Sequence, residues 1–329
     1  MNFNLKDLFN IFKSQFSIKD VENEFNNSVT FEFFGDEPSA LAVAEILMPE
    51  NEEVNINHFP TSSSECSRIT NSTFSLFFTD TAIMDIDGIS KVLRSIPINL
   101  RKKVIFCVKG EAEPIQVENV NSLFSKMAMK KPIWYKTESN FCEKLIKYLG
   151  RNVFSAARLY PGLRDSLSDS LIFNISRDNA GIALVSSIPA EAPIIGPVAG
   201  LFAVPGETVI LTANQIRLAM RIAAIYGAEI DFFARMAELW PILAGAFGWK
   251  TFARTVCGFI PVAGPAIKAS IAFGGSYVVG TAAKKYYRDK KLLTTKELKD
   301  IYSFAKRQFF DKILHSDFIK KMFGRRKKH

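Results

Sequence analysis

The fold class is decided by residues 29–47, which read VTFEFFGDEPSALAVAEIL. The first six residues are rich in β-branched and aromatic side chains, which is typical of a β-strand. Gly35 ends this run, and the stretch from Pro38 to Leu47 then has a proline near its first turn, followed by good helix formers. The pattern predicts a strand, a turn at Gly35 and a helix.

The same alternation continues along the chain. Apolar runs at 74–78, 104–108 and 132–135 predict three more strands, and helical patterns follow at 89–96 and 141–149. Strands that alternate with helices of this length are typical of βαβ units in a parallel sheet. We therefore predict a parallel-sheet α/β domain over residues 28–152, preceded by an amphipathic N-terminal helix within residues 1–27.

Beyond residue 152 the strand pattern stops, which predicts an all-α apolar domain over residues 153–291. Two stretches in it are almost free of charge: Ala180–Pro205 contains only Glu191, and Thr255–Ala283 contains only Lys268. These two charges could pair with each other, which would offset their desolvation, or each could lie at a solvent-facing turn.

The two apolar stretches allow two interpretations. Prolines and a lone charge in each leave the free energy of membrane insertion near zero. Small residues such as Gly274, Gly275 and Gly280, followed directly by Lys284, Lys285 and Arg288, favour membrane insertion or re-entrant docking with the basic end on the cytoplasmic side. The alternative is that both stretches are buried helices of a soluble core.

The positive charge is concentrated at the C-terminal end. From Lys284 onward the chain has 16 lysines and arginines against 5 acidic residues, a net charge of +11, whereas the whole chain carries +9. Residues 292–329 form a basic amphipathic tail with Leu298, Tyr302, Ala305, Phe309 and Ile313 on one helical face, and it ends in Arg325, Arg326, Lys327 and Lys328. Such a tail suits anionic lipid or nucleic acid, and phenylalanines at helical spacing favour lipid.

Other candidate contacts are weaker. Arg217 and Arg221 lie one turn apart on a predicted helix, where they could contact lipid phosphates or a partner carboxylate, or form a solvated face. The four cysteines form no CxxC pair and have no histidine neighbours, which argues against a disulfide framework and a zinc site. The N-terminal residues lack the pattern of a signal peptide. We expect no metal site, no cofactor and no catalytic residues.

The order strand–Gly–helix, strand–Thr-Asp and strand–Lys-Gly-Glu resembles a small GTPase of the Era class. In that family the first loop reads GxxxxGK[ST], whose lysine and hydroxyl hold phosphate and Mg²⁺. The corresponding positions here are Gly35, Ser39, Ala40, Leu41 and Ala42, so the lysine and the hydroxyl are absent. Val108–Glu111 stands where the base-reading NKxD motif would be, and it keeps only the lysine. The resemblance implies a degenerate GTPase-like domain that does not bind nucleotide; the alternative is an unrelated α/β domain that never did.

The second half resembles a bacterial GTPase-associated helical domain of unknown function. The resemblance is carried by the runs PGETVILTANQIRLAMRIAAIYG at 205–227 and FIPVAGPAIK at 259–268. It implies association with a GTPase system and with the cytoplasmic face of the bacterial inner membrane. From these observations we expect a non-catalytic, membrane-associated interaction or scaffold protein, which binds lipid and a protein partner or a second copy. The alternatives are a divergent nucleotide hydrolase and a nucleic-acid-binding protein that uses the tail.

Overall fold

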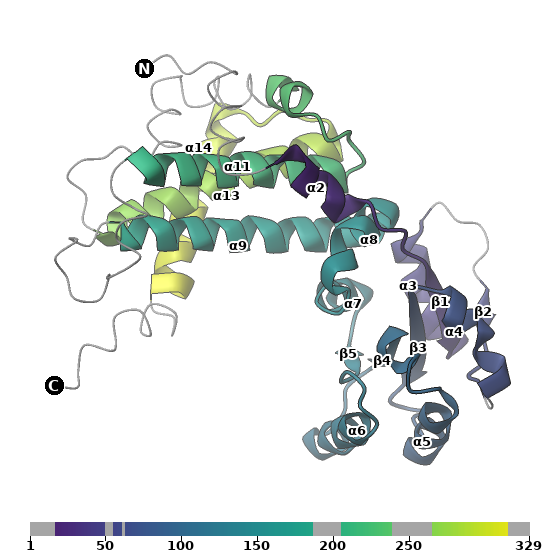
Figure 1. The fold of residues 1–329 in the computed structure, drawn as a ribbon. Coiled ribbons are helices and arrows are strands. Elements are labelled where there is room, and N and C mark those ends of the chain that lie inside the picture. The colour runs from purple at the N-terminus through teal and green to yellow at the C-terminus, as the bar shows by residue number, and fades with distance from the viewer. Residues whose placement is uncertain (1–16, 50–54, 61–62, 187–204, 239–264, 315–329) are drawn as a thin grey trace. The chain divides into compact units, whose positions relative to one another are not determined.

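The chain separates into two compact units (Figure 1). The computed structural model describes residues 17–49, 55–60, 63–186, 205–238 and 265–314. Glu24–Leu167 form one unit, here called the α/β unit, and Met1–Asn23 together with Ser168–His329 form the other, here called the helical unit. Residues 153–167 belong to the α/β unit and contact its first strand. The Tyr160 hydroxyl donates to the carbonyl oxygen of Val29 at 3.2 Å and accepts from the backbone N–H of Phe31 at 3.3 Å.

A five-stranded parallel sheet confirms the predicted α/β class. Its strands lie in the order β2-β1-β3-β4-β5. Their bounds are β1 (Phe31–Gly35), β2 (Ile56–Asn57), β3 (Phe74–Asp80), β4 (Val104–Lys109) and β5 (Ile133–Tyr135). This is the flavodoxin-like order of doubly wound folds, in which the chain reverses direction across the sheet between β1 and β3.

Helices cover both faces of the sheet. One face packs against α4 (Ser67–Asn71), α5 (Ile86–Ser95) and α6 (Pro114–Lys126) through a buried cluster that includes Phe34, Phe77 and Phe106. The other face packs against α3 (Glu37–Leu47) and α7 (Glu138–Leu145), and α8 (Val153–Leu159) follows. Much of the chain's phenylalanine fills these two layers, because strands covered on both faces need apolar side chains in both directions.

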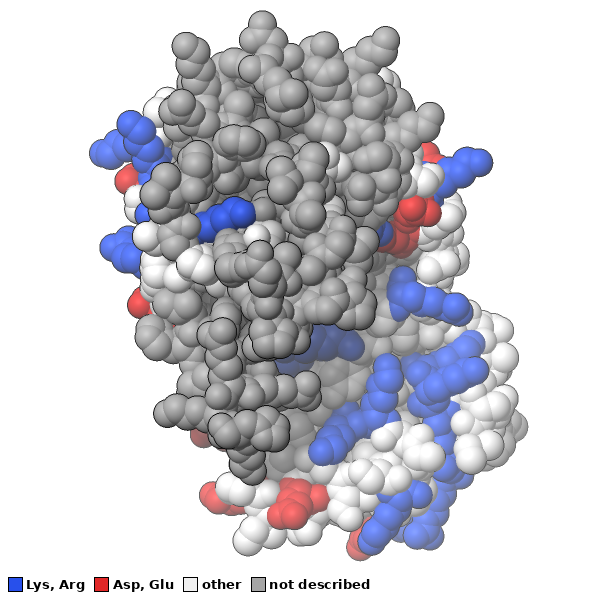
Figure 2. Space-filling model, turned by 60° about the vertical axis from the view of Figure 1, so that its left-hand side comes forward, with Lys and Arg blue, Asp and Glu red and all other residues white. Residues whose placement is uncertain are grey.

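The β5 edge of the sheet is protected by lysines. β5 has three residues, and the Lys144 ammonium donates to the carbonyl oxygen of Trp134 within it. Figure 2 shows Lys and Arg side chains gathered over the lower part of the molecule, with few acidic side chains among them. Short edge strands flanked by lysine resist pairing with another chain, which gives Lys144 a structural role at β5.

The described elements of the helical unit include α2 (Ile18–Phe25), α9 (Arg164–Val185, which starts in the α/β unit), α11 (Pro205–Ile225), α13 (Pro265–Asp289), α14 (Thr295–Gln308) and a π-helical turn at Phe309–Leu314. Among them, α13 packs against α9, α11, α14 and the turn that follows α14. A Cβ added to Gly280 of α13 would lie 2.6 Å from Ile172 and 2.9 Å from Leu218, so glycine lets α13 approach both α9 and α11. Of the five residues on the predicted helical face, Leu298 and Ala305 of α14 and Phe309 of the following turn are buried and Tyr302 is half-buried. The side chain of Ile313 is not among those described.

Burial between helices explains the apolar character of residues 265–283. Fourteen residues of α13 are buried, among them Phe273 and Gly280, and they pack within the same chain. Most of residues 265–283 are therefore buried against other helices of the chain, and residues 255–264 and 187–204 lie outside the described residues. Among the described residues, no helix is both long enough and apolar enough to cross a membrane.

Substitution of Gly35 tests the close packing of β1 against β3. Gly35 has φ +99°, and an added Cβ would lie 2.3 Å from the carbonyl oxygen of Phe78 in the neighbouring strand. Gly35→Ala should therefore cost about 1–2 kcal/mol for the left-handed backbone and about 1–3 kcal/mol more for displacing β3. Gly150→Ala is the matched control, since Gly150 has φ +55° with open space around it. Hydrogen exchange of β1 and β3 amides measures both, and an equal effect of the two substitutions would contradict the packing argument.

Candidate functional site

The carboxyl ends of the strands are the place where an open α/β sheet binds ligands, at the point where the strand order reverses. Here that point lies between β1 and β3. The backbone continues the sheet past each strand end: the N–H of Asp36 donates to Phe78 at 3.0 Å, that of Thr81 to Lys109 at 2.9 Å and that of Gly110 to Tyr135 at 2.9 Å. We call this set of loops the carboxyl edge.

The turn between β1 and α3 is one residue long. β1 ends at Gly35 and α3 begins at Glu37, so only Asp36 connects them. A phosphate-binding loop needs several consecutive N–H groups that curve around the anion. One connecting residue cannot form such a curve, and Pro38 in the first turn of α3 removes a further N–H donor.

The Asp36 carboxylate occupies the N-terminal end of α3. Its Oδ2 accepts from the backbone N–H of Ser39 at 3.1 Å, and its carbonyl oxygen accepts from Ala40 at 3.0 Å. The N-terminus of a helix attracts anions, and here the protein supplies its own. An approaching phosphate would meet a negative charge where the positive end of the helix should be.

The residues aligned with the phosphate loop lie inside α3. Ser39 and Ala40 are buried, and Leu41 and Ala42 are half-buried. Gly35 is the last residue of β1. These positions serve helix–sheet packing.

Two further polar groups near the carboxyl edge, Lys109 and Tyr135, are paired or buried. Lys109 at the end of β4 pairs with Glu138 in the first turn of α7 at 3.1 Å. The backbone and the Lys109 ammonium hold the pKa of Glu138 below its ordinary value. The Tyr135 hydroxyl is buried beside Ser39, and burial raises its pKa, so it stays protonated and cannot act as a base.

The described cysteines and acidic residues do not form a reactive or metal-binding cluster. Burial raises the pKa of Cys66, Cys107 and Cys142, the last to about 11, which keeps these thiols neutral. No group of three or more His, Cys, Asp or Glu side chains within the described ranges could hold a metal ion.

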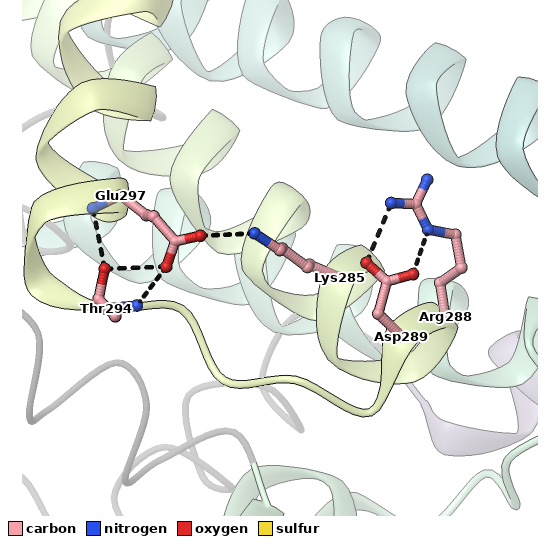
Figure 3. A network of polar contacts seen from close by, with 5 residues as sticks. All are labelled: Lys285, Arg288, Asp289, Thr294 and Glu297. Atoms are coloured by element: carbon pink, nitrogen blue, oxygen red, sulfur yellow. Dashed lines mark hydrogen bonds and ion pairs between the residues drawn. The ribbon is translucent and has the colours of Figure 1, made fainter.

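The basic residues in the last turns of α13 are paired within the helical unit. Lys284 donates to Asp169 of α9 at 2.7 Å, and Arg288 pairs with Asp289 at 2.7 Å. Lys285 donates to Glu297 at 2.6 Å, as Figure 3 shows. Glu297 also accepts from the N–H and the hydroxyl of Thr294. The hydrogen bond from Lys285, followed by those from Thr294, lowers the pKa of Glu297 to about 2. Lys284 and Lys285 therefore fasten α13 to α9 and α14.

The other predicted contacts are placed as follows. Arg217 and Arg221 are half-buried on α11. Lys268 lies on α13 and donates to the Ser186 hydroxyl at 3.2 Å. Glu191, its suggested partner, lies outside the described residues, as do Arg325, Arg326, Lys327 and Lys328.

Sequence reasoning missed the role of Asp36. An aspartate followed by Glu-Pro before an apolar helix is a helix N-cap signal, and it was available in the sequence. Asp36 lies between Gly35 and Ser39, within the stretch that resembles a degenerate phosphate loop, and that resemblance obscured the cap. Ile83, Ile86 and Ile115, which are exposed after β3 and in the first turns of α5 and α6, were also missed, because nothing in their local pattern indicates exposure.

Asp36→Ala should destabilise α3 by about 1 kcal/mol, because the N–H of Ser39 loses its acceptor. Asp36→Asn keeps an acceptor oxygen at the same position and should retain most of the stability. Hydrogen exchange of the first-turn amides of α3 distinguishes the two variants. Equal protection in the wild-type and alanine forms would show that the cap contributes nothing.

No protein-family model matches this chain, and no significant match was found among curated proteins or solved structures.

Proposed function

We propose that this protein is a non-catalytic interaction protein that attaches to the cytoplasmic face of the bacterial inner membrane through basic side chains. The observation that carries the non-catalytic part is the self-capped turn at Asp36, which fills the place where a nucleotide phosphate would bind. The link to a GTPase system rests on the resemblance of the helical half and is part of the same proposal.

Surface attachment is supported by one face of α14. Lys296, Lys299 and Arg307 are exposed and make no ion pair with other described residues. They lie on one side of the helix, opposite buried Leu298 and Ala305, together with exposed Asp300, which leaves these four residues a net charge of +2. Phe304 lies next to them and is 42% exposed. A basic helix face with an exposed aromatic ring suits an anionic lipid surface.

This surface differs from the one expected from the sequence. Lys284, Lys285 and Arg288 were expected to contact the membrane, yet each pairs with a carboxylate of the same chain. Lys296, Lys299 and Arg307, with the C-terminal residues Arg325–Lys328, replace them in the proposal. Attachment of this kind is peripheral and sensitive to salt, because exposed charges are screened.

The test is co-sedimentation of the full chain with vesicles that contain anionic lipid. Replacing Lys296, Lys299 and Arg307 together by Gln should weaken binding by about a hundredfold at low salt, since each basic residue near such a surface contributes ~1 kcal/mol. The control replaces three exposed lysines of the α/β unit by Gln, namely Lys102, Lys126 and Lys131.

Equal weakening by the two triple variants would contradict attachment through α14. Binding that survives high salt and alkaline carbonate would contradict peripheral attachment and would favour insertion of the chain into the membrane. Retention on DNA without lipid, lost as salt rises, would favour the nucleic-acid alternative.

A further inference from the structure

The two ends of the parallel sheet in the α/β unit carry opposite charge. All five strands run the same way, so the loops before them lie at one end and the loops after them at the other. Residues 80–87 and 110–118, after β3 and β4, contain six carboxylates and no lysine or arginine. Residues 94–103 and 126–131, before β4 and β5, contain seven lysines and arginines and no carboxylate. We call the first pair of segments the acidic end and the second pair the basic end.

Hydrogen bonds join the two segments of the basic end into one surface. The Arg101 guanidinium donates to the carbonyl oxygens of Ile96 at 3.1 Å and Met127 at 3.0 Å, and so links the segment before β4 to the segment before β5. The basic residues of this end are Arg94, Arg101, Lys102, Lys103, Lys126, Lys130 and Lys131. None of them forms an ion pair with a described carboxylate, so the described part of the chain leaves their positive charge uncompensated.

The acidic end is joined in a similar way and keeps most of its charge. The N–H of Thr81 donates to the carbonyl oxygen of Lys109 at 2.9 Å, which places the loops after β3 and β4 side by side. The acidic residues of this end are Asp80, Asp85, Asp87, Glu111, Glu113 and Glu118. Of these, Glu111 pairs with Lys136, just after β5.

Helix stability explains only part of this distribution. Acidic residues in the first turn of a helix and basic residues in its last turn stabilise it, which accounts for Asp87 and Arg94 of α5. Lys130 and Lys131 lie between α6 and β5, outside the helices, so this effect does not explain them. The basic end therefore has more positive charge than the helices of the unit require.

Exposed isoleucines lie at both ends. At the acidic end Ile83 is 63% exposed and Ile115 is 74% exposed, and at the basic end Ile98 is 74% exposed. A single exposed apolar residue is common. A protein–protein contact surface combines an apolar centre with a polar rim, and each end has both.

We propose that the acidic end of one copy of this protein binds the basic end of a second copy, with Ile98 of one copy against Ile83 and Ile115 of the other. The two surfaces match in charge and in apolar groups, and both belong to this chain. Because the two surfaces differ, each dimer keeps one free acidic end and one free basic end, and association continues beyond the dimer. The contact needs no lipid. It goes beyond the proposed function and can fail while membrane attachment holds.

Sedimentation velocity of the full chain without lipid, at low salt, tests this contact. We expect the average sedimentation coefficient to rise past that of a dimer as the protein concentration increases from about 1 µM to about 1 mM, the range of a weak interface. High salt should reverse the rise, since exposed charges are screened. A monomer at all these concentrations would overturn the proposal. So would association that stops at a dimer, because a head-to-tail contact leaves free ends.

Charge reversal at each end tests which surfaces meet. The basic-end variant carries Lys102→Glu, Lys126→Glu and Lys131→Glu, and the acidic-end variant carries Asp87→Lys, Glu113→Lys and Glu118→Lys. Each should weaken association by about a hundredfold, because three attractive charge pairs, each contributing about fivefold, become repulsive. An equal mixture of the two variants should associate again, since the reversed ends are once more opposite in charge.

The mixture separates a lost contact from a lost fold. Each substitution changes the charge by two, so the variants carry net charges of +3 and +15 in place of +9. Both are positive, so general attraction between them does not produce rescue. A mixture that stays monomeric would overturn the proposal.

Two matched controls complete the test. Reversal of Lys296, Lys299 and Arg307 to Glu makes the same change of charge on α14 and should leave association unchanged. Ile98→Ser should weaken association by about tenfold, since the apolar contact is lost. Leu292→Ser, at a position 60% exposed in the helical unit, should not. Equal effects of a variant and its control would overturn the proposal.

Discussion

The close approach of β1 to β3 at Gly35 is the constraint on which the α/β unit depends. The carbonyl oxygen of Phe78 lies where a Cβ would be, so this position requires glycine, and the chain enters α3 two residues later. That leaves Asp36 as the single connecting residue, and its carboxylate caps the helix. The close packing of β1 and β3, the one-residue turn and the carboxylate at the start of α3 therefore occur at adjacent residues. A nucleotide would have to separate these groups before its phosphates could reach the helix.

The helical unit depends on a different constraint, the small residues of α13. Gly280 brings α9 and α11 close, and a polar seam forms between the three helices. In that seam the amide of Asn179 donates to the Ser276 hydroxyl at 2.8 Å, and Gln215 donates to the same hydroxyl at 3.1 Å. Buried polar groups that pair in this way favour one arrangement of the helices over others, because any sliding leaves them unpaired. One turn beyond Gly280 on α13, the ion pairs of Lys284 and Lys285 hold α13 to α9 and α14. The apolar composition that suggests a membrane segment therefore also builds a closely packed helical unit.

The sequence predicts elements that depend on neighbouring residues better than contacts between residues far apart in the chain. The strand at 31–35, the helix at 37–47 and the buried face of α14 have local patterns, and they were found. β2 has two residues, too few for a pattern, and the strand order depends on contacts between distant segments. The same holds for the bonds of Tyr160 with Val29 and Phe31, and for the pair of Lys284 with Asp169, 115 residues away in the chain. Lysines beside an apolar helix look alike whether they contact lipid or a carboxylate.

The account's central claim is that the chain's own carboxylate and a one-residue turn fill the phosphate position. Calorimetric titration of the full chain with GTP and with ATP, each with Mg²⁺, tests this most directly. The Asp36→Asn variant, titrated in parallel, removes the charge and keeps the short turn. The account expects no saturable binding in either form. A dissociation constant below about 1 mM for the wild type, equivalent to about −4 kcal/mol, would contradict the claim. The same constant in the Asp36→Asn variant alone would show that the charge of Asp36, and not the length of the turn, prevents nucleotide binding.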